Sequence, residues 1–461
     1  MCMRFLLFLL MLLAFGISGC MEQGNETLLP QPQSLGQEFS TFQPPAKPME
    51  TRETPEIICP DGVITLREAL ALALMHNPEL KAFSWDVRVS DARQLQAGLW
   101  PNPELDVEVE NVGGSGELSG FDGAETTIQL SQLIELGDKS DKRIKVASLE
   151  KELAGLDYEA KRLDVFTEVT KAFIEVLTTQ QRLALMKELL QLSEELVGTV
   201  NKRVEAGKDS PLEKTKATVA HSNIKIQYQQ AVGNLEFARK QLASTWAGQL
   251  PRFESVAGKL DSLSPLPAID QLTLLISQNP DMARWSLEID KGRASLELEK
   301  ARAISDVTLS GGLRRFSETD DNAIVFGISI PLPISDTNQG GRMEAAYALS
   351  RVREEQRAAQ SDIQMELARA YQALSNSHAE ATELNNNILD EAESVFEASR
   401  TGYSVGKLDY LHVLDAQRTL FEVKTQYIDA LGSFHAAKTD VERLIGSPIE
   451  NITISENEDS K

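Results

Sequence analysis

The hydrophobic pattern is dominated by one very long helical run, from about Lys139 to Ala206. It contains no proline, and it carries Glu, Lys, Gln and Arg on the faces away from one apolar seam. It predicts a helix about 100 Å long at roughly 1.5 Å per residue, far beyond what a globular domain uses. The seam repeats in steps of three and four residues and consists of Leu149, Leu153, Leu156, Ala160, Leu163, Phe166, Val169, Phe173 and Val176.

A second run of the same kind extends from about Gly341 to Gly402. Each run ends in a Gly-Lys pair and is followed by a return helix, predicted over 211–246 and about 409–445. Matching features therefore recur about 200 residues apart, which indicates an internal duplication. The paired positions are Gly207 with Gly406 and Arg143 with Arg342, each 199 residues apart, and Asn77 with Asn279, 202 residues apart.

The period changes to two in four short stretches, 104–112, 125–134, 306–315 and 323–332. These stretches predict two β-hairpins, one in each half, with an apolar face and a small or polar face. An ordinary half-buried hairpin is the alternative, but equivalent placement in two repeats favours strands that face lipid on one side and water on the other. Four strands cannot close a barrel alone, so several copies must associate, and three copies would supply twelve strands.

The first residues resemble a bacterial lipoprotein signal. Arg4 precedes an apolar run that is too short to span a bilayer, and 17–20, Ile-Ser-Gly-Cys, resembles a lipobox. We expect 1–19 to be a signal peptide and Cys20 to be acylated. Cys59 would then be the only other thiol of the mature chain, which leaves no intrachain disulfide.

The remaining chain is predicted to divide at changes in composition. A linker rich in Pro, Gln, Glu and Thr covers 20–62, and the first repeat covers 63–250. A connector over 251–268 leads to the second repeat over 269–447, and an acidic tail ends the chain from 448 to 461.

The charge balance and the motifs exclude several classes of function. The chain has 69 acidic and 46 basic side chains and a formal net charge of −23, so nucleic-acid binding is not expected. The acidic excess suits a water-filled, cation-tolerant passage, or simply keeps long helices hydrated. No nucleophile elbow, phosphate loop or paired-His motif appears, and the histidines form no ligand-spaced cluster. We therefore expect no enzyme activity, no cofactor and no dedicated metal site.

Over about 63–446, the duplicated order of helix, hairpin, long helix, tip and return helix resembles the TolC family of outer-membrane efflux channels. Local motifs support this resemblance, including Tyr403-Ser-Val-Gly-Lys-Leu-Asp-Tyr-Leu-His-Val-Leu-Asp-Ala-Gln417 and Pro331-Leu-Pro333. Segments 135–143 and 205–213 are similar to elements of CzcC-like channels, which serve cobalt, zinc and cadmium efflux.

The resemblance implies a mainly α fold with a small β part. It implies a homotrimer with a twelve-strand barrel in the outer membrane and a periplasmic tunnel of twelve helices. The partners would be a periplasmic adaptor and an inner-membrane pump of the RND class, and the channel itself would be passive.

The resemblance also implies a periplasmic gate at the helical tips. By position, Asp415 matches an acidic ring at the constriction, and His412 falls where the family often has a second acid. Tyr403 and Glu213 match residues that latch neighbouring helices, and Asp409 begins the return helix at the same tip. Leu408 stands where some members carry a latch arginine. For Tyr403, Glu213 and Asp415, ordinary packing or solvated positions remain the alternatives.

Three other functions remain open from the residues alone. A multidrug efflux channel and a channel for type I protein secretion would use the same architecture. A periplasmic coiled-coil adaptor lipoprotein would also explain the long helices and the lipid anchor, but it predicts lipoyl-like β modules in place of two symmetric hairpins.

Overall fold

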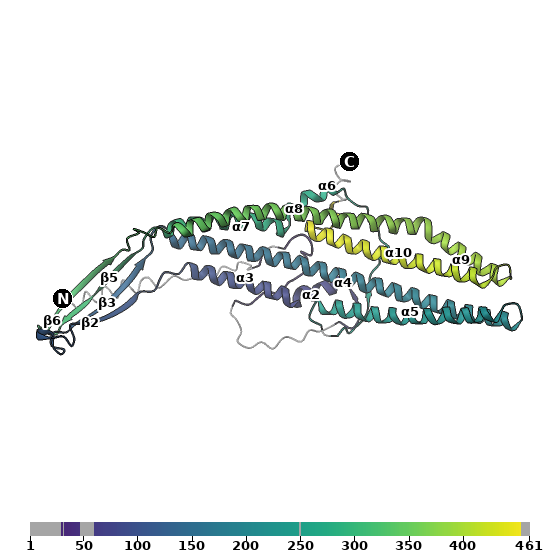
Figure 1. Ribbon diagram of the computed structural model, residues 1–461, viewed down its shortest axis with the longest axis horizontal. Helices are drawn as coiled ribbons and strands as arrows, with labels where there is room; N and C mark the ends of the chain where they lie inside the picture. Colours follow the sequence, from purple (N-terminus) through teal and green to yellow (C-terminus); the bar gives the residue numbers. More distant parts are fainter. Residues whose placement is uncertain (1–28, 31, 47–59, 249, 453–461) are drawn as a thin grey trace.

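The computed structural model describes residues 29–30, 32–46, 60–248 and 250–452, and it is an elongated rod of helices with strands at one end (Figure 1). The predicted signal peptide, Cys20, Cys59 and most of the acidic tail lie outside the described residues. The prediction of a mainly helical fold with a small β part is confirmed.

The first long helix is a single element, α4, Lys139–Glu205, of 67 residues. Its predicted seam is largely buried, and Leu163, Val169 and Val176 are fully covered. Helix α5, Pro211–Ser244, starts with proline at its first turn and runs back along α4 (Figure 1). The two helices pack along their length and form one long antiparallel hairpin, with Ala217 and Leu242 of α5 buried near its two ends.

The second long helix is interrupted, which the sequence pattern did not predict. It consists of α8, Gln339–Glu383, a π-helical turn at Leu384–Ile388, and α9, Leu389–Ser404. Three successive asparagines, 385–387, occupy the π turn. Asparagine has a low helix propensity, so three in succession favour an interruption of the α-helix at this point. Helix α10, Tyr410–Ile445, returns along α8 and α9.

Two shorter helices extend each return helix toward the strands. In the first half these are α2, Leu66–His76, and α3, Pro78–Ala97; in the second half they are α6, Ile269–Leu275, and α7, Pro280–Arg302, joined by a short 3-10 turn, η2, at Ile276–Gln278. A capping box between Thr65 and Glu68 starts α2.

The two Asn-Pro pairs join these helices to the ends of the return helices. Asn77 caps α3 by accepting from Leu80 N at 3.0 Å, and its amide donates to Thr245 O, just beyond α5, at 2.8 Å. Asn279 caps α7 in the same way, and its amide donates to Arg443 O and Leu444 O at the end of α10. The duplication is thus visible as two equivalent, buried junctions.

The two predicted hairpins join into one antiparallel sheet. Its strands are β2, Glu104–Glu110; β3, Glu125–Ile134; β5, Val307–Phe316; and β6, Asp321–Ser329, in the order β2-β3-β5-β6. A short helical turn, η1 at Gly116–Leu118, lies in the loop between β2 and β3. The hairpins therefore meet along β3 and β5, a pairing that the sequence pattern did not specify.

One face of this sheet is an exposed apolar surface. The register aligns one apolar row across all four strands: Val107, Ile128, Leu313 and Ile324. Exposure reaches 62% at Val107 and 85% at Phe326, so the rest of the described chain does not cover these side chains. On the opposite face, Arg314 pairs with Glu110 and Glu125 at 3.3 and 3.2 Å. No other described residues therefore pack over the apolar side of the sheet.

The predicted linker and connector contain more structure than their composition indicated. Strand β4, Phe253–Ala257, in the connector pairs in parallel with β1, Gly62–Thr65. In the linker, Leu35 is buried in the main apolar cluster with residues of α4, α5 and α10. The described part of the linker therefore docks on the helices, because a few apolar side chains suffice to dock a segment that has no periodicity.

Candidate functional site at the helical tips

Two equivalent turns close the end of the rod farthest from the sheet (Figure 1). In the first turn, Lys208 N donates to Arg203 O at 2.9 Å, and in the second, Lys407 N donates to Gly402 O at 2.8 Å. Gly207 and Gly406 have φ of +72° and +78°, the left-handed conformation that glycine adopts without strain. The long helices of the two repeats therefore end with the same backbone geometry, at their Gly-Lys pairs.

The return helices also begin alike. Ser210 accepts from Leu212 N at 3.2 Å at the start of α5, and Asp409 accepts from His412 N at 3.3 Å at the start of α10. These caps stop the turns from fraying and fix the direction in which each return helix leaves the tip.

A buried polar network ties the two turns together. The Tyr403 hydroxyl donates to Asp209 Oδ2 at 2.7 Å, and Arg203 Nε donates to the same oxygen at 2.9 Å. Arg203 also donates to Tyr403 O at 2.9 Å, and its guanidinium lies 4.6 Å from the centre of the Tyr403 ring. Tyr403 is only 2% exposed, while the side chains of Arg203 and Asp209 are 16% and 12% exposed, so the network is partly shielded from water. We call these three residues the tip latch.

The electrostatics of the tip latch favour the ionised carboxylate. The hydrogen bonds from Arg203 lower the pKa of Asp209 below its usual range. The same contact raises the pKa of Arg203, and burial together with the Asp209 carboxylate raises the pKa of Tyr403. At neutral pH the latch is a charged pair plus a neutral phenol, which is the combination that makes strong hydrogen bonds.

The other predicted gate residues lie around the tip latch, mostly in contact with solvent. His412 Nδ1 lies 2.6 Å from Asp409 Oδ1, with both side chains about 60% exposed (61% and 62%), and this contact lowers the pKa of Asp409. Asp415 is exposed one turn further along α10 and lines a surface groove with His412. Glu213 pairs with Lys216 on its own helix at 3.2 Å, while its Oε2 is buried without a hydrogen bond to any described atom. Tyr403 thus contacts Asp209 and not Glu213.

Sequence reasoning missed Arg203 and Asp209. Both flank the Gly-Lys pair of the first tip, and the repeat replaces them by Gly402 and Leu408 in the second tip. This asymmetry was the available signal, because a charged pair present in one repeat only marks a contact that the duplication does not repeat.

The described residues hold no group of three or more His, Cys, Asp or Glu side chains placed to bind a metal ion. Within the same ranges, the helices include none that is both long enough and apolar enough to cross a membrane.

Comparison with known proteins defines the class of this chain. Residues 69–248 and 272–447 match the model of the family described as outer membrane efflux protein, and the chain belongs to that family. The resemblance to TolC-family channels is thereby confirmed.

Individual relatives refine the comparison. The chain is 34% identical to the cobalt-zinc-cadmium resistance protein CzcC of Cupriavidus metallidurans, over 84% of this chain and 90% of that protein. It is 26% identical to the nickel-cobalt-cadmium resistance protein NccC of Alcaligenes xylosoxydans xylosoxydans, over 67% of this chain and 70% of that protein. Among solved structures, a membrane protein from Pseudomonas aeruginosa shares the fold with a TM-score of 0.72 at 18% identity, covering 89% of this chain and 98% of that one.

Proposed function

We propose that three copies of this chain form a passive outer-membrane channel that exports heavy-metal cations as part of a tripartite efflux system. The observation that carries the proposal is the four-stranded sheet with an uncovered apolar face at one end of a helical rod. A lipid bilayer is the environment that such a face fits, and neighbouring copies would pair with the free edges of β2 and β6. The rod would continue the passage into the periplasm.

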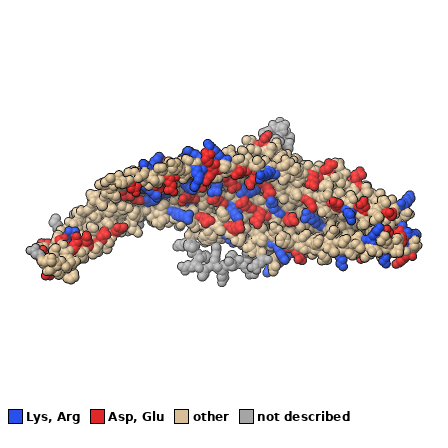
Figure 2. Space-filling model, viewed as in Figure 1, with Lys and Arg blue, Asp and Glu red and all other residues tan. Residues whose placement is uncertain are grey.

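The names of CzcC and NccC support divalent metal cations as the cargo. The acidic row on the polar face of β2, which includes Asp106 and Glu108, would favour cations inside the passage. Figure 2 shows acidic side chains over the sheet and mixed charges along the helices. A multidrug or type I secretion channel is the second candidate, because the fold suits either cargo. Family membership and the two joined hairpins favour a channel over a periplasmic adaptor.

A deletion strain tests the cargo. Loss of the gene should sensitise cells to cobalt, zinc or cadmium, and complementation should restore resistance. Sensitivity to drugs alone, with unchanged metal tolerance, would favour the second candidate. Crosslinking of the purified full chain in detergent tests the assembly, since the proposal requires a trimer.

We also propose that the tip latch, with Asp415, His412, Asp409 and Glu213 around it, forms the resting gate. Three copies placed near one axis would bring each exposed acid close to two copies of itself, and the latch would hold the tips against that repulsion. An adaptor and an inner-membrane pump would bind at this end and supply the work of opening.

We further propose acylation at Cys20, which would anchor the chain to the outer membrane. Labelled palmitate should be incorporated into the wild-type chain and not into Cys20→Ala. Equal labelling of both would refute the anchor without affecting the channel proposal.

A further inference from the structure

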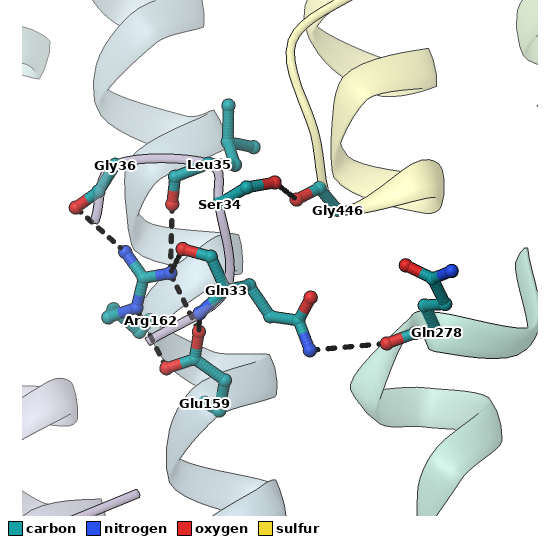
Figure 3. Close-up of polar contacts among 8 residues, drawn as sticks. All are labelled: Gln33, Ser34, Leu35, Gly36, Glu159, Arg162, Gln278 and Gly446. Atoms are coloured by element: carbon teal, nitrogen blue, oxygen red, sulfur yellow. Dashed lines mark hydrogen bonds and ion pairs between the residues drawn. The ribbon is translucent and has the colours of Figure 1, made fainter. Parts of the chain in front are cut away.

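A buried ion pair on α4 has no role in the tip or in the sheet. Glu159 and Arg162 are 2% and 1% exposed, and they are joined by two hydrogen bonds of 2.7 and 2.8 Å (Figure 3). Burying two charges is costly unless their remaining hydrogen-bonding capacity is filled. Glu159 and Arg162 therefore need further hydrogen-bond partners.

The partner is the backbone of the chain's own N-terminal segment. Arg162 donates to Leu35 O at 2.8 Å, to Gly36 O at 3.3 Å and to Gln33 O at 3.4 Å, while Glu159 accepts from Gln33 N at 2.5 Å. Figure 3 shows the segment wrapped around the guanidinium. The planar fork of arginine suits this arrangement because its donors point in several fixed directions at once.

Two residues, Leu35 and Gly36, make the contact selective for sequence. Leu35 is 3% exposed and packs in the main apolar cluster. Gly36 has φ of +71°, and a Cβ there would lie 2.8 Å from the Phe166 ring and 3.1 Å from the Arg162 guanidinium. The site thus accepts leucine followed by glycine and rejects a larger second residue.

The same segment reaches the second repeat. Ser34 Oγ and Leu35 N donate to Gly446 O, at 2.9 and 3.2 Å, where α10 ends. Gln33 Nε2 donates to Gln278 O in η2 at 3.2 Å. Further along, Arg88 of α3 donates to Pro44 O at 3.1 Å. One short segment therefore contacts α4 and α3 of the first repeat together with α10 and η2 of the second.

We propose that Arg162 and Glu159 form a binding site for a Leu-Gly peptide segment, that residues 33–36 of the same chain fill it, and that the filled site fastens the end of the second repeat onto the first. Residues 33–36 are thus a ligand that the chain supplies to its own binding site. Without it, the ion pair loses four hydrogen bonds and the end of α10 loses two.

Hydrogen exchange of the full chain in detergent, read by mass spectrometry, tests this. Gly36→Ala leaves the ion pair intact but introduces the clash, and we expect exchange in 32–39 and in 440–449 to accelerate about tenfold or more. Gly120→Ala is the matched control, because Gly120 also has a positive φ, +77°, but has nothing within 4 Å. It should leave both regions at the wild-type rate.

Arg162→Lys is the second variant, chosen because it keeps the charge opposite Glu159 while removing the fork. It should deprotect the same two regions and speed cleavage after the exposed Glu38 by a Glu-specific protease. Unchanged protection of 32–39 in both variants would overturn the binding site. Deprotection confined to 32–39, with 440–449 unchanged, would overturn the fastening of the second repeat.

Discussion

The hydroxyl of Tyr403 donates to the carboxylate of Asp209 at 2.7 Å, across 194 residues of sequence. This bond joins the tip of one helical hairpin to the tip of the other within a single chain. Because Arg203 holds the same carboxylate and also the backbone of Tyr403, a movement of either tip must break several hydrogen bonds together.

Removing the hydroxyl should loosen the tip. Tyr403→Phe keeps the buried ring but leaves Asp209 with Arg203 alone, and we expect a higher single-channel conductance in planar bilayers. Tyr410→Phe is the control: Tyr410 is also buried and packs edge-on against Tyr403, with ring centres 6.1 Å apart. Combining Tyr403→Phe with Asp415→Ala should raise conductance further. If the double variant conducts like the wild type, the latch does not restrain the gate.

The latch should respond to acid in a defined direction. The pKa of Asp209 is lowered in the latched tip, so the stabilisation from its charge is present above the ordinary aspartate pKa of about 4 and is lost as the pH falls through the lowered value. Conductance should stay low from neutral to mildly acidic pH and rise below about 4. Asp209→Asn should be conductive already at neutral pH and should lose this step. A step of the same size in the variant would assign the titration to another group.

The buried junction at Asn77 should be sensitive to a change that preserves its cap. Asn77→Asp keeps an acceptor for Leu80 N but replaces the amide donor that faces Thr245 O with a carboxylate oxygen. We expect a loss of about 1–3 kcal/mol in the free energy of unfolding, seen as a lower Tm. The exposed Asn234→Asp on α5 is the matched control and should change Tm little. Equal shifts in both variants would mean that added negative charge, and not the junction, is responsible.

The acidic row of β2 should set ion preference. Asp106 and Glu108 project from the polar face of the sheet and are exposed, and Asp106 accepts a 3.2 Å hydrogen bond from Ser131. Replacing both by Asn and Gln should shift the reversal potential in a salt gradient toward lower cation preference. Substituting the exposed Glu236 and Glu254 by Gln, away from the four-stranded sheet and from the tip, removes the same charge and should leave the reversal potential in place. If the reversal potential shifted equally in both variants, the total charge of the protein, and not the location of the acids on β2, would set the ion preference.

Much of the fold followed from local pattern. The step of three and four residues along 149–176 required a long helix, and the alternation around Val107 and Ile128 required strands. The repeated Gly-Lys and Asn-Pro pairs located equivalent tips and junctions. These features depend on neighbours a few positions away, so they can be read without knowing what packs against them. The π turn at Leu384–Ile388 was missed because buried apolar residues, Ala381 and Ala392, recur on both sides of it as they would along an uninterrupted helix.

The sequence by itself determined the long helices, the four strands of the two hairpins, their duplication and the resemblance to a family of channels. Only the tertiary structure decided that β3 pairs with β5, that Tyr403 meets Asp209 and not Glu213, and that Arg162 binds the carbonyls near Leu35. Each of these contacts joins segments more than 100 residues apart. A helical seam or a strand pattern specifies which face is buried, but it leaves open the partner and the register along a uniform apolar stripe, which are fixed only when the elements pack together.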